Sequence, residues 1–406
     1  MHMEFHRTVI CLSTLVLLAG CGVESNDTSQ REAESSSAST AAYESVAIYR
    51  VASEEKVFSL LTYDFDHDGT TDVFPNGHDQ TDQIYLRNSD TFEALMPLHS
   101  PGAIDRHGCA MTDVEGADYL YCTQGADAGA GAGLNELFIG DGTGYFERIE
   151  QHGAEEPTGR SRLASFMNFD GDDLPDLYVT VWHVERTDDE PNENTILRNT
   201  GNMRFEQVAT AATGAIGTKC LVTDDLNNDG FDDIVLCDHS SLGSKVFLND
   251  GRGDFNEITS RLGLSGRQLL WTDADVGFVD NNEYLDLVVS HAGAVQVFYD
   301  VGNLEVATVR TERISVGSYV AGIALSDLNR DGQLDIYAAK REHWNTNQNS
   351  NDVVDQIYLG PTWDQMIEVP AADTPSENVV FYPSHGVVVA HASHNSGGEV
   401  WVVELE

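Results

Sequence analysis

The stretch Asp64-Phe-Asp66-His-Asp68-Gly69-Thr-Thr-Asp72 carries carboxylates at positions 1, 3, 5 and 9 of a nine-residue segment. In a tight turn these side chains and the backbone carbonyl at position 7 converge on one point. A hard cation with many oxygen ligands suits such a site. The segment therefore predicts a calcium loop.

Three further segments, Asn168–Asp176, Asp225–Asp233 and Asp327–Asp335, repeat this spacing, so we expect about four structural calcium ions. The expected ligands, with the carbonyl at position 7 included, are Asp64, Asp66, Asp68, Thr70, Asp72, Asn168, Asp170, Asp172, Leu174, Asp176, Asp225, Asn227, Asp229, Phe231, Asp233, Asp327, Asn329, Asp331, Gln333 and Asp335. The last carboxylate stands at position 9 rather than 12, and β-rich runs such as Val57–Thr62 flank the loops. These features exclude an EF-hand and favour a β-hairpin that carries the ion.

Weaker copies of the loop complete a regular series. They are Thr112–Asp118, which is about three residues shorter, Phe278–Asp286, which has Phe at position 1, and Asn378–Gly386, which keeps only the strands. Seven units then follow one another with a period of roughly fifty residues. A second strand pair follows most loops, as at Asp82–Asn88, which gives four strands per unit. Four strands per repeat is a propeller blade, so we predict an all-β, seven-bladed β-propeller whose inner hairpin loops bind calcium.

These repeats resemble the FG-GAP, or VCBS, repeats of integrin-α-type β-propellers, and the resemblance covers about residues 44–406. It implies an adhesion or recognition module. The last unit runs out of chain before its outer strand, and we expect Tyr43–Ala52 to supply that strand and close the ring. Because Phe278 removes a ligand, we expect the loop at 278–286 to bind calcium weakly or not at all.

The N-terminal segment predicts export. Residues 5–18 are apolar but too few for an ordinary membrane-spanning helix, so residues 1–20 are interpreted as a signal peptide. The small residues before Cys21 resemble a bacterial lipobox, which implies a lipidated Cys21; ordinary secretory cleavage nearby is the alternative. Residues 21–43 are predicted to be a flexible tether, and 44–406 the propeller. We expect an exported protein, lipid-anchored at the outer membrane or cell surface, that contacts the membrane only through this anchor.

Four further cysteines flank two of the loops. Cys109 and Cys122 lie symmetrically about the shortened loop, and Cys220 and Cys237 lie almost symmetrically about Asp225–Asp233. Two antiparallel strands joined at such a loop would place each pair within disulfide reach. An exported compartment would keep them oxidised. Four buried free thiols remain the alternative.

The net charge is −45, with 67 acidic residues. Phosphate binding needs a basic surface, so nucleic acid is excluded as a default partner. Four Ca²⁺ ions would neutralise only eight negative charges. Most of the acidic residues are therefore expected to form a solvated surface.

A histidine follows the second strand in six of the seven units. Because a hairpin reverses direction, these histidines and the residues just before each first strand are expected on the face opposite the calcium loops. The candidate ligand-binding residues there are His107, Arg160, Arg162, His183, His239, His291 and His343.

Three interpretations of this face stay open. The histidines can be polar turn residues repeated by duplication. They can belong to a binding surface in which aromatic rings stack on sugars and Arg or His binds acidic groups. They can also serve an extracellular carbohydrate-active enzyme, such as a polysaccharide lyase, with His as general acid or base. We favour a binding module over an enzyme; the sequence does not identify the glycan or protein ligand.

Overall fold

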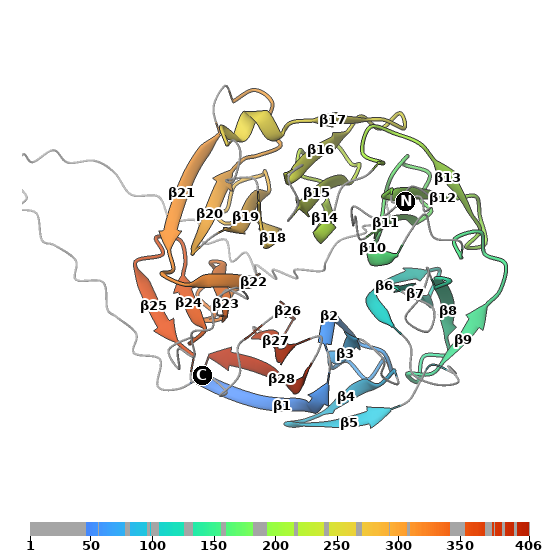
Figure 1. The fold of residues 1–406 in the computed structure, drawn as a ribbon, viewed down its shortest axis with the longest axis horizontal. Coiled ribbons are helices and arrows are strands. Elements are labelled where there is room, and N and C mark those ends of the chain that lie inside the picture. The colour runs from blue at the N-terminus through green and yellow to red at the C-terminus, as the bar shows by residue number, and fades with distance from the viewer. Residues whose placement is uncertain are drawn as a thin grey trace, which may run out of the picture.

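A computed structural model describes residues 46–405 except 56, 78–81, 96–97, 99–104, 126–132, 156–159, 182–192, 215–217, 239–242, 265–269, 292, 307–308, 342–353, 370–375, 377, 384–385 and 394–395. The described chain forms seven four-stranded antiparallel sheets arranged as a ring (Figure 1). The predicted all-β, seven-bladed propeller is thus confirmed. The predicted signal peptide, tether and Cys21 lie outside the described residues. No described helix is long and apolar enough to cross a bilayer.

Each blade is a meander whose first strand faces the centre of the ring (Figure 1). From the inside outward, blade 1 consists of β2 (Val57–Tyr63), β3 (Asp72–Gly77), β4 (Ile84–Asn88) and β5 (Thr91–Leu95), and blade 2 of β6 (Arg106–Val114), β7 (Ala117–Gln124), β8 (Glu136–Gly140) and β9 (Phe146–Ile149). Blade 3 consists of β10 (Ser161–Met167), β11 (Asp176–Val181), β12 (Thr195–Asn199) and β13 (Phe205–Val208). Blade 4 consists of β14 (Thr218–Asp224), β15 (Asp233–Asp238), β16 (Lys245–Asn249) and β17 (Phe255–Glu257). A 3-10 helix, η1 (Thr259–Leu262), follows blade 4.

The same order continues around the ring. Blade 5 consists of β18 (Asp273–Gly277), β19 (Asp286–His291), β20 (Ala294–Tyr299) and β21 (Arg310–Ser315). Blade 6 consists of β22 (Tyr319–Ser326), β23 (Asp335–Arg341), β24 (Gln356–Leu359) and β25 (Gln365–Glu368). Blade 7 consists of β26 (Asn378–Tyr382), β27 (Gly386–Ser393), β28 (Ser396–Leu405) and β1 (Val46–Glu55).

The second strand of a blade is buried on both faces because a neighbouring blade packs on each side. Every residue of β3, β11 and β15 is buried, whereas the outermost strand β5 is largely exposed. Continuous apolar runs such as Ile234–Cys237 are typical of a strand covered on both faces. Burial of each such Val, Leu or Ile side chain stabilises the fold by about 1.5–3 kcal/mol.

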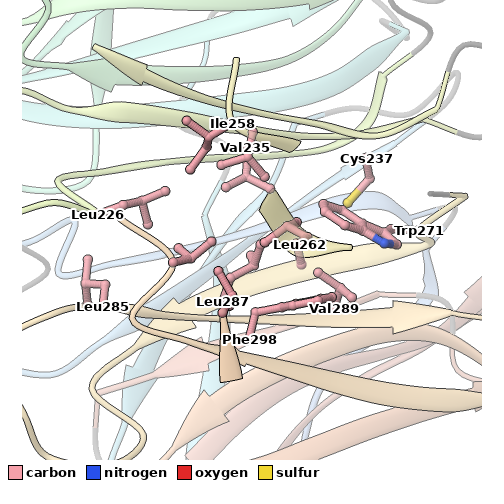
Figure 2. Packing of buried hydrophobic residues seen from close by; sticks show 14 of the residues in the cluster. Leu226, Val235, Cys237, Ile258, Leu262, Trp271, Leu285, Leu287, Val289 and Phe298 are labelled. Atoms are coloured by element: carbon pink, nitrogen blue, oxygen red, sulfur yellow. The ribbon is translucent and has the colours of Figure 1, made fainter. Parts of the chain in front are cut away.

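Figure 2 shows the contact between blades 4 and 5. Val235 and Ile258 of blade 4 pack with Leu287 and Phe298 of blade 5 around the indole of Trp271, which is 1% exposed. A continuous apolar layer therefore joins the two sheets. This packing sets the spacing between the first strands of the two blades.

Two disulfides join paired strands. Cys109 bonds Cys122 across β6 and β7, and Cys220 bonds Cys237 across β14 and β15. The Cα atoms are 4.2 and 4.8 Å apart. The predicted pairing is confirmed, and the alternative of four free thiols is not what the structure shows.

The ring is closed by the N-terminal strand. β1 pairs antiparallel with β28, with Val46 opposite Leu405 and Glu55 opposite Gly398. This confirms the prediction that the start of the propeller supplies the outer strand of blade 7. The observed strand spans Val46–Glu55, shifted by a few residues from the predicted Tyr43–Ala52.

A chain that lacks residues 1–55 should be at least about 3 kcal/mol less stable than one that lacks residues 1–43. The longer truncation exposes the hydrogen-bonding edge of β28 and removes Val51 and Ala52, which are buried. Urea-induced unfolding of the two truncated proteins measures the difference. Equal midpoints and slopes would show that β1 does not hold the ring closed.

Candidate functional site

The four strong loops share one turn geometry. In three of them a residue at position 4 and a glycine at position 6 adopt left-handed conformations: His67 and Gly69 have φ values of 57° and 87°, and the pairs Asn228–Gly230 and Arg330–Gly332 match them. The fourth loop reverses the order, with Gly171 at position 4 and Asp173 at position 6. This backbone conformation turns N–H groups toward the carboxylate at position 1. Asp64 therefore accepts hydrogen bonds from the backbone N–H groups of Asp68 and Gly69, at N–O distances of 3.1 and 3.0 Å.

The residue at position 7, expected to offer its carbonyl, is held in place by the side chain at position 5. The N–H of Thr70 donates to Oδ1 of Asp68 at 2.8 Å, and Leu174, Phe231 and Gln333 make the corresponding bond in their loops. A fixed backbone at position 7 is what a carbonyl ligand requires.

Three clusters of carboxylates have oxygens within 4.8 Å of one another: Asp64, Asp66 and Asp72; Asp170, Asp172 and Asp176; and Asp280, Asp286 and Asp300. The first two clusters match predicted ligands. The third includes Asp300, which lies after β20 and outside the loop motif. In the loops of blades 4 and 6, position 3 is Asn227 or Asn329, so this position offers an amide oxygen instead of a carboxylate.

A buried carboxylate oxygen without a hydrogen-bond donor indicates whether the loops fit a cation. Oδ1 of Asp170 is buried and accepts no hydrogen bond from the described residues. Burial, followed by repulsion from Asp172, raises the pKa of Asp170. An all-oxygen donor set that contains such an atom fits a calcium ion.

The aspartate at position 9 has a second role that the sequence analysis missed. Asp233 is completely buried; one of its oxygens accepts from Leu226 N at 2.9 Å and the other from Asn249 N at 2.7 Å. It thus ties the loop to the end of the third strand, β16. Asp72, Asp176, Asp286 and Asp335 make the same two connections in their blades. We call this aspartate the latch.

Burial dominates the electrostatics of the latch. It raises the pKa of Asp72 to about 7 and that of Asp233 to about 9, with smaller contributions from the neighbouring loop carboxylates and opposition from the two backbone donors. A latch carboxylate beside several other carboxylates is therefore ionised more easily when a cation is close. The latch and its partner at the third strand are 14 to 25 residues apart, so no constant spacing in the sequence could have revealed this contact.

Blade 2 replaces the calcium loop with contacts from blade 1. Its shortened loop retains Asp118, which accepts a hydrogen bond from the hydroxyl of Tyr63 at 2.6 Å. Nε2 of His67 lies 2.6 Å from the other oxygen of Asp118. Side chains of the neighbouring blade therefore hold this carboxylate.

At the other end of the inner strands, five hairpins contain β-bulges. Five inner hairpins shift register near the start of the first strand, where Phe58, His107 with Gly108, Arg162 with Leu163, Lys219 and Ala321 are inserted. A bulge re-aims the inserted side chain. Since each first strand begins at the end away from its calcium loop, the bulges place these side chains on the opposite face. We call this set, with Arg160, Tyr319 and Arg341, the channel mouth.

Three of the inserted side chains contact one another. The rings of Phe58 and His107 are 4.1 Å apart, and the guanidinium carbon of Arg162 lies 5.3 Å from the centre of Phe58. Nη1 of Arg162 lies 2.5 Å from Nδ1 of His107, while Nε2 of His107 is 3.3 Å from Oδ1 of Asp105. Because arginine only donates, Nδ1 is the acceptor, and the imidazole proton is assigned to Nε2, facing Asp105.

Gly125 lies directly against this pair. A Cβ there would be 1.9 Å from the His107 ring and 2.8 Å from Nη1 of Arg162, so only glycine fits. Burial lowers the pKa of Arg162 to about 10, opposed by Asp105 and reinforced by Arg160. Arg162 is therefore still positively charged at neutral pH.

A second group lies farther around the mouth. The Lys219 ammonium is 5.8 Å and the Arg341 guanidinium carbon 5.4 Å from the centre of the Tyr319 ring. Asp273 is the acidic neighbour of Lys219, and burial raises its pKa to about 7. The mouth thus combines two aromatic rings with several cationic groups.

The predicted ligand residues have different outcomes. His107, Arg160 and Arg162 come together at the mouth, but His107 and Arg162 are largely buried. His291 ends β19 and is half-buried. His183, His239 and His343 lie outside the described residues. Phe58, Tyr319 and Arg341 were missed, although Phe58, Arg162 and Lys219 each stand six residues before position 1 of their loops, a spacing that could have found Phe58.

Two segments of the chain match a known repeat family. The model of the FG-GAP-like repeat matches residues 168–236 and 279–338, which include the loops of blades 3 to 6. The chain is a β-propeller with FG-GAP-like repeats. No curated protein sequence matches it.

Solved structures resemble this chain to different degrees, and of the three that follow only YCF48 has a TM-score above 0.5. YCF48, solved bound to a D1 peptide, is 9% identical with a TM-score of 0.54, covering 90% of this chain and 96% of that one. The WD40 propeller domain of Doa1 is 12% identical with a TM-score of 0.47, covering 89% and 98%. A lectin of Agrocybe aegerita that recognises non-reducing terminal N-acetylglucosamine is 16% identical with a TM-score of 0.40, covering 64% and 67%. At these identities the likeness extends to the fold alone.

Two substitutions in the same loop distinguish the structural role of the latch aspartate from its role in metal binding. In the presence of a chelator, Asp233→Ala should destabilise the protein by about 2–5 kcal/mol, because two buried N–H groups lose their acceptor. Asp229→Ala, at an exposed position of the same loop, should change the metal-free stability by less than about 0.5 kcal/mol. Urea titrations with EDTA measure both. Equal effects of the two substitutions would contradict a separate latch role.

Proposed function

We propose that the chain is a calcium-stabilised recognition module that binds an anionic glycan at the channel mouth. The observation that carries this proposal is the series of bulges that directs Phe58, His107, Arg162 and Lys219 to one end of the channel. Bulges are found next to functional sites because they re-aim side chains at a local cost in strand pairing. Their repetition in adjacent blades supports a shared binding role.

Charge favours an anionic ligand. Against a net charge of −45, the mouth brings Arg160, Arg162, Lys219 and Arg341 near two described acidic groups, Asp105 and Asp273. Guanidinium groups bind carboxylates and sulfates through charge-assisted hydrogen bonds. The mouth is therefore a place where an acidic polymer would be attracted rather than repelled.

The aromatic rings favour a sugar. Phe58 and Tyr319 offer apolar faces next to cationic groups, an arrangement suited to sugar rings that carry acidic substituents. The lyase alternative has less support, because His107 is 1% exposed and is engaged by Arg162 and Asp105. A general base must reach the substrate proton. We therefore propose binding without cleavage of the polysaccharide, and the binding experiment would also detect cleavage.

Calcium has a structural role in this proposal. Carboxylates such as Asp64, Asp66 and Asp72 would hold an ion that offsets their mutual repulsion and clamps the inner hairpin. The clamps lie at the end of the first strands opposite the mouth. They would hold the blades in position without contacting the ligand.

Export and anchoring complete the proposal. With Cys21 lipidated, the 24 residues that precede Val46 would connect the membrane to β1. A flexible segment of this length has an average end-to-end distance of about 27 Å. The propeller would thus sit close to the membrane surface, joined to it only through the outer strand of blade 7.

Chelation should lower the melting temperature. An ion that binds only the native state contributes about 2.7 kcal/mol per site when its free concentration is 100 times the dissociation constant. Thermal unfolding followed by circular dichroism in calcium and in EDTA measures the effect. Asp66→Ala should reduce the difference by the contribution of one site. Superimposable curves for the wild-type protein would rule out stabilisation by calcium.

Lys219→Ala should weaken binding to acidic polysaccharides by roughly tenfold or more, because a hydrogen bond to a charged group contributes about 1.5–3 kcal/mol. The probes are immobilised polygalacturonate and dextran sulfate, with neutral dextran as a ligand control. Lys245→Ala is the matched control, since Lys245 pairs with Glu257 on β16 and β17, away from the mouth.

Wild-type binding to the acidic polymers should fall as salt rises. Unchanged binding by Lys219→Ala, or equal binding to neutral dextran, would contradict the proposed site. A rise in ultraviolet absorbance from unsaturated products would instead indicate the lyase alternative.

A further inference from the structure

The loop of blade 5 lacks the first metal ligand but keeps a dense group of carboxylates. Phe278 occupies position 1 and is 47% exposed. Asp280 and Asp286 nevertheless meet Asp300, with oxygens within 4.8 Å of one another. Three carboxylates this close repel one another unless a positive charge is near. Something in the blade must offset that repulsion.

The structure places a guanidinium at this position. Arg310, the first residue of β21, forms an ion pair with Oδ2 of Asp280 through its Nη2. Its guanidinium carbon lies 3.4 Å from the centre of the Tyr299 ring, which holds the planar group against strand β20. Asn282 also donates its amide to Oδ1 of Asp300 at 2.5 Å.

The clusters of blades 1 and 3 differ in this respect. Among the described residues, no Lys or Arg forms an ion pair with Asp64, Asp66 or Asp72, or with the cluster around Asp176. Arg198 acts on the blade 3 cluster only at longer range, since its ion pair is with Glu206. The blade with the substituted first ligand is therefore the one in which an arginine forms a direct ion pair with the described cluster. Phe278 and Arg310 are 32 positions apart in sequence yet act on one loop.

We propose that Arg310 is the resident cation of blade 5 and takes the place that calcium has in the other loops. This inference rests on the proposal that those loops hold calcium. An isolated exposed ion pair contributes little to stability. This guanidinium, in contrast, pairs with Asp280, whose carboxylate lies in a cluster with two others, and it is held by an aromatic ring. It would keep the fifth inner hairpin closed at any calcium concentration.

The test compares Arg310→Met with Arg313→Met, a substitution on the same strand whose residue pairs with Gln296 and not with the cluster. In EDTA, Arg310→Met should lower the melting temperature more than Arg313→Met. Calcium should then recover more of the loss in Arg310→Met than in the control. Ion counting after equilibrium dialysis should find one more calcium per chain in Arg310→Met than in the wild-type protein.

A second substitution keeps the result interpretable if Arg310→Met folds poorly. Adding Asp280→Asn to Arg310→Met removes one of the repelling charges and should restore part of the melting temperature in EDTA. Equal behaviour of the two Met variants in EDTA would overturn the proposal, as would an unchanged ion count. If no variant responds to calcium, the calcium proposal fails, and the comparison in EDTA still decides whether Arg310 offsets the cluster.

Discussion

The buried latch aspartate is the interaction on which the inner hairpins of blades 1, 3, 4, 5 and 6 depend. A turn that leaves β2 for β3 exposes backbone N–H groups at a point covered by the neighbouring blade, and these groups need acceptors. Asp72 supplies both, one in the loop and one at the end of the third strand. The same carboxylate belongs to the carboxylate cluster that we propose holds calcium, so metal binding and sheet assembly would share one side chain. This sharing explains why the loop keeps Asp286 even in blade 5, where the first ligand is gone.

Positive charge is scarce in this chain, and the structure concentrates it at a few places. Arg106 lies buried between Asp82 and Glu136, where it joins blades 1 and 2. Arg162 and Lys219 face the channel mouth, and Arg310 faces the cluster of blade 5. Unpaired burial of a guanidinium is costly, so each of these positions comes with acidic or aromatic neighbours.

Much of the fold could be predicted from the sequence because its signals are periodic. The loops set the repeat, the strand runs set the blade, and the cysteine spacing identified both disulfides. The channel mouth was harder, since a β-bulge is a shift in register that leaves no change in composition. Arg106 directly precedes the candidate residue His107, yet it lies in a blade interface because Asp82 and Glu136 come from two separate blades. Asp300 and Arg310 lie outside the nine-residue loop, so its spacing could not reveal them.

The pairing of β1 with β28 has a consequence for how the molecule is made. Its two strands come from opposite ends of the described chain, so the outer strand of blade 7 is synthesised first and its partner last. Until β28 has emerged, β1 has no partner in the sheet and its edge is an open template for other strands, and such edges promote aggregation. Pairing between distant segments is also slow, because a long loop must close before any contact forms. The ring therefore closes only after β28 has been synthesised, and a nascent propeller must be shielded from other chains until then.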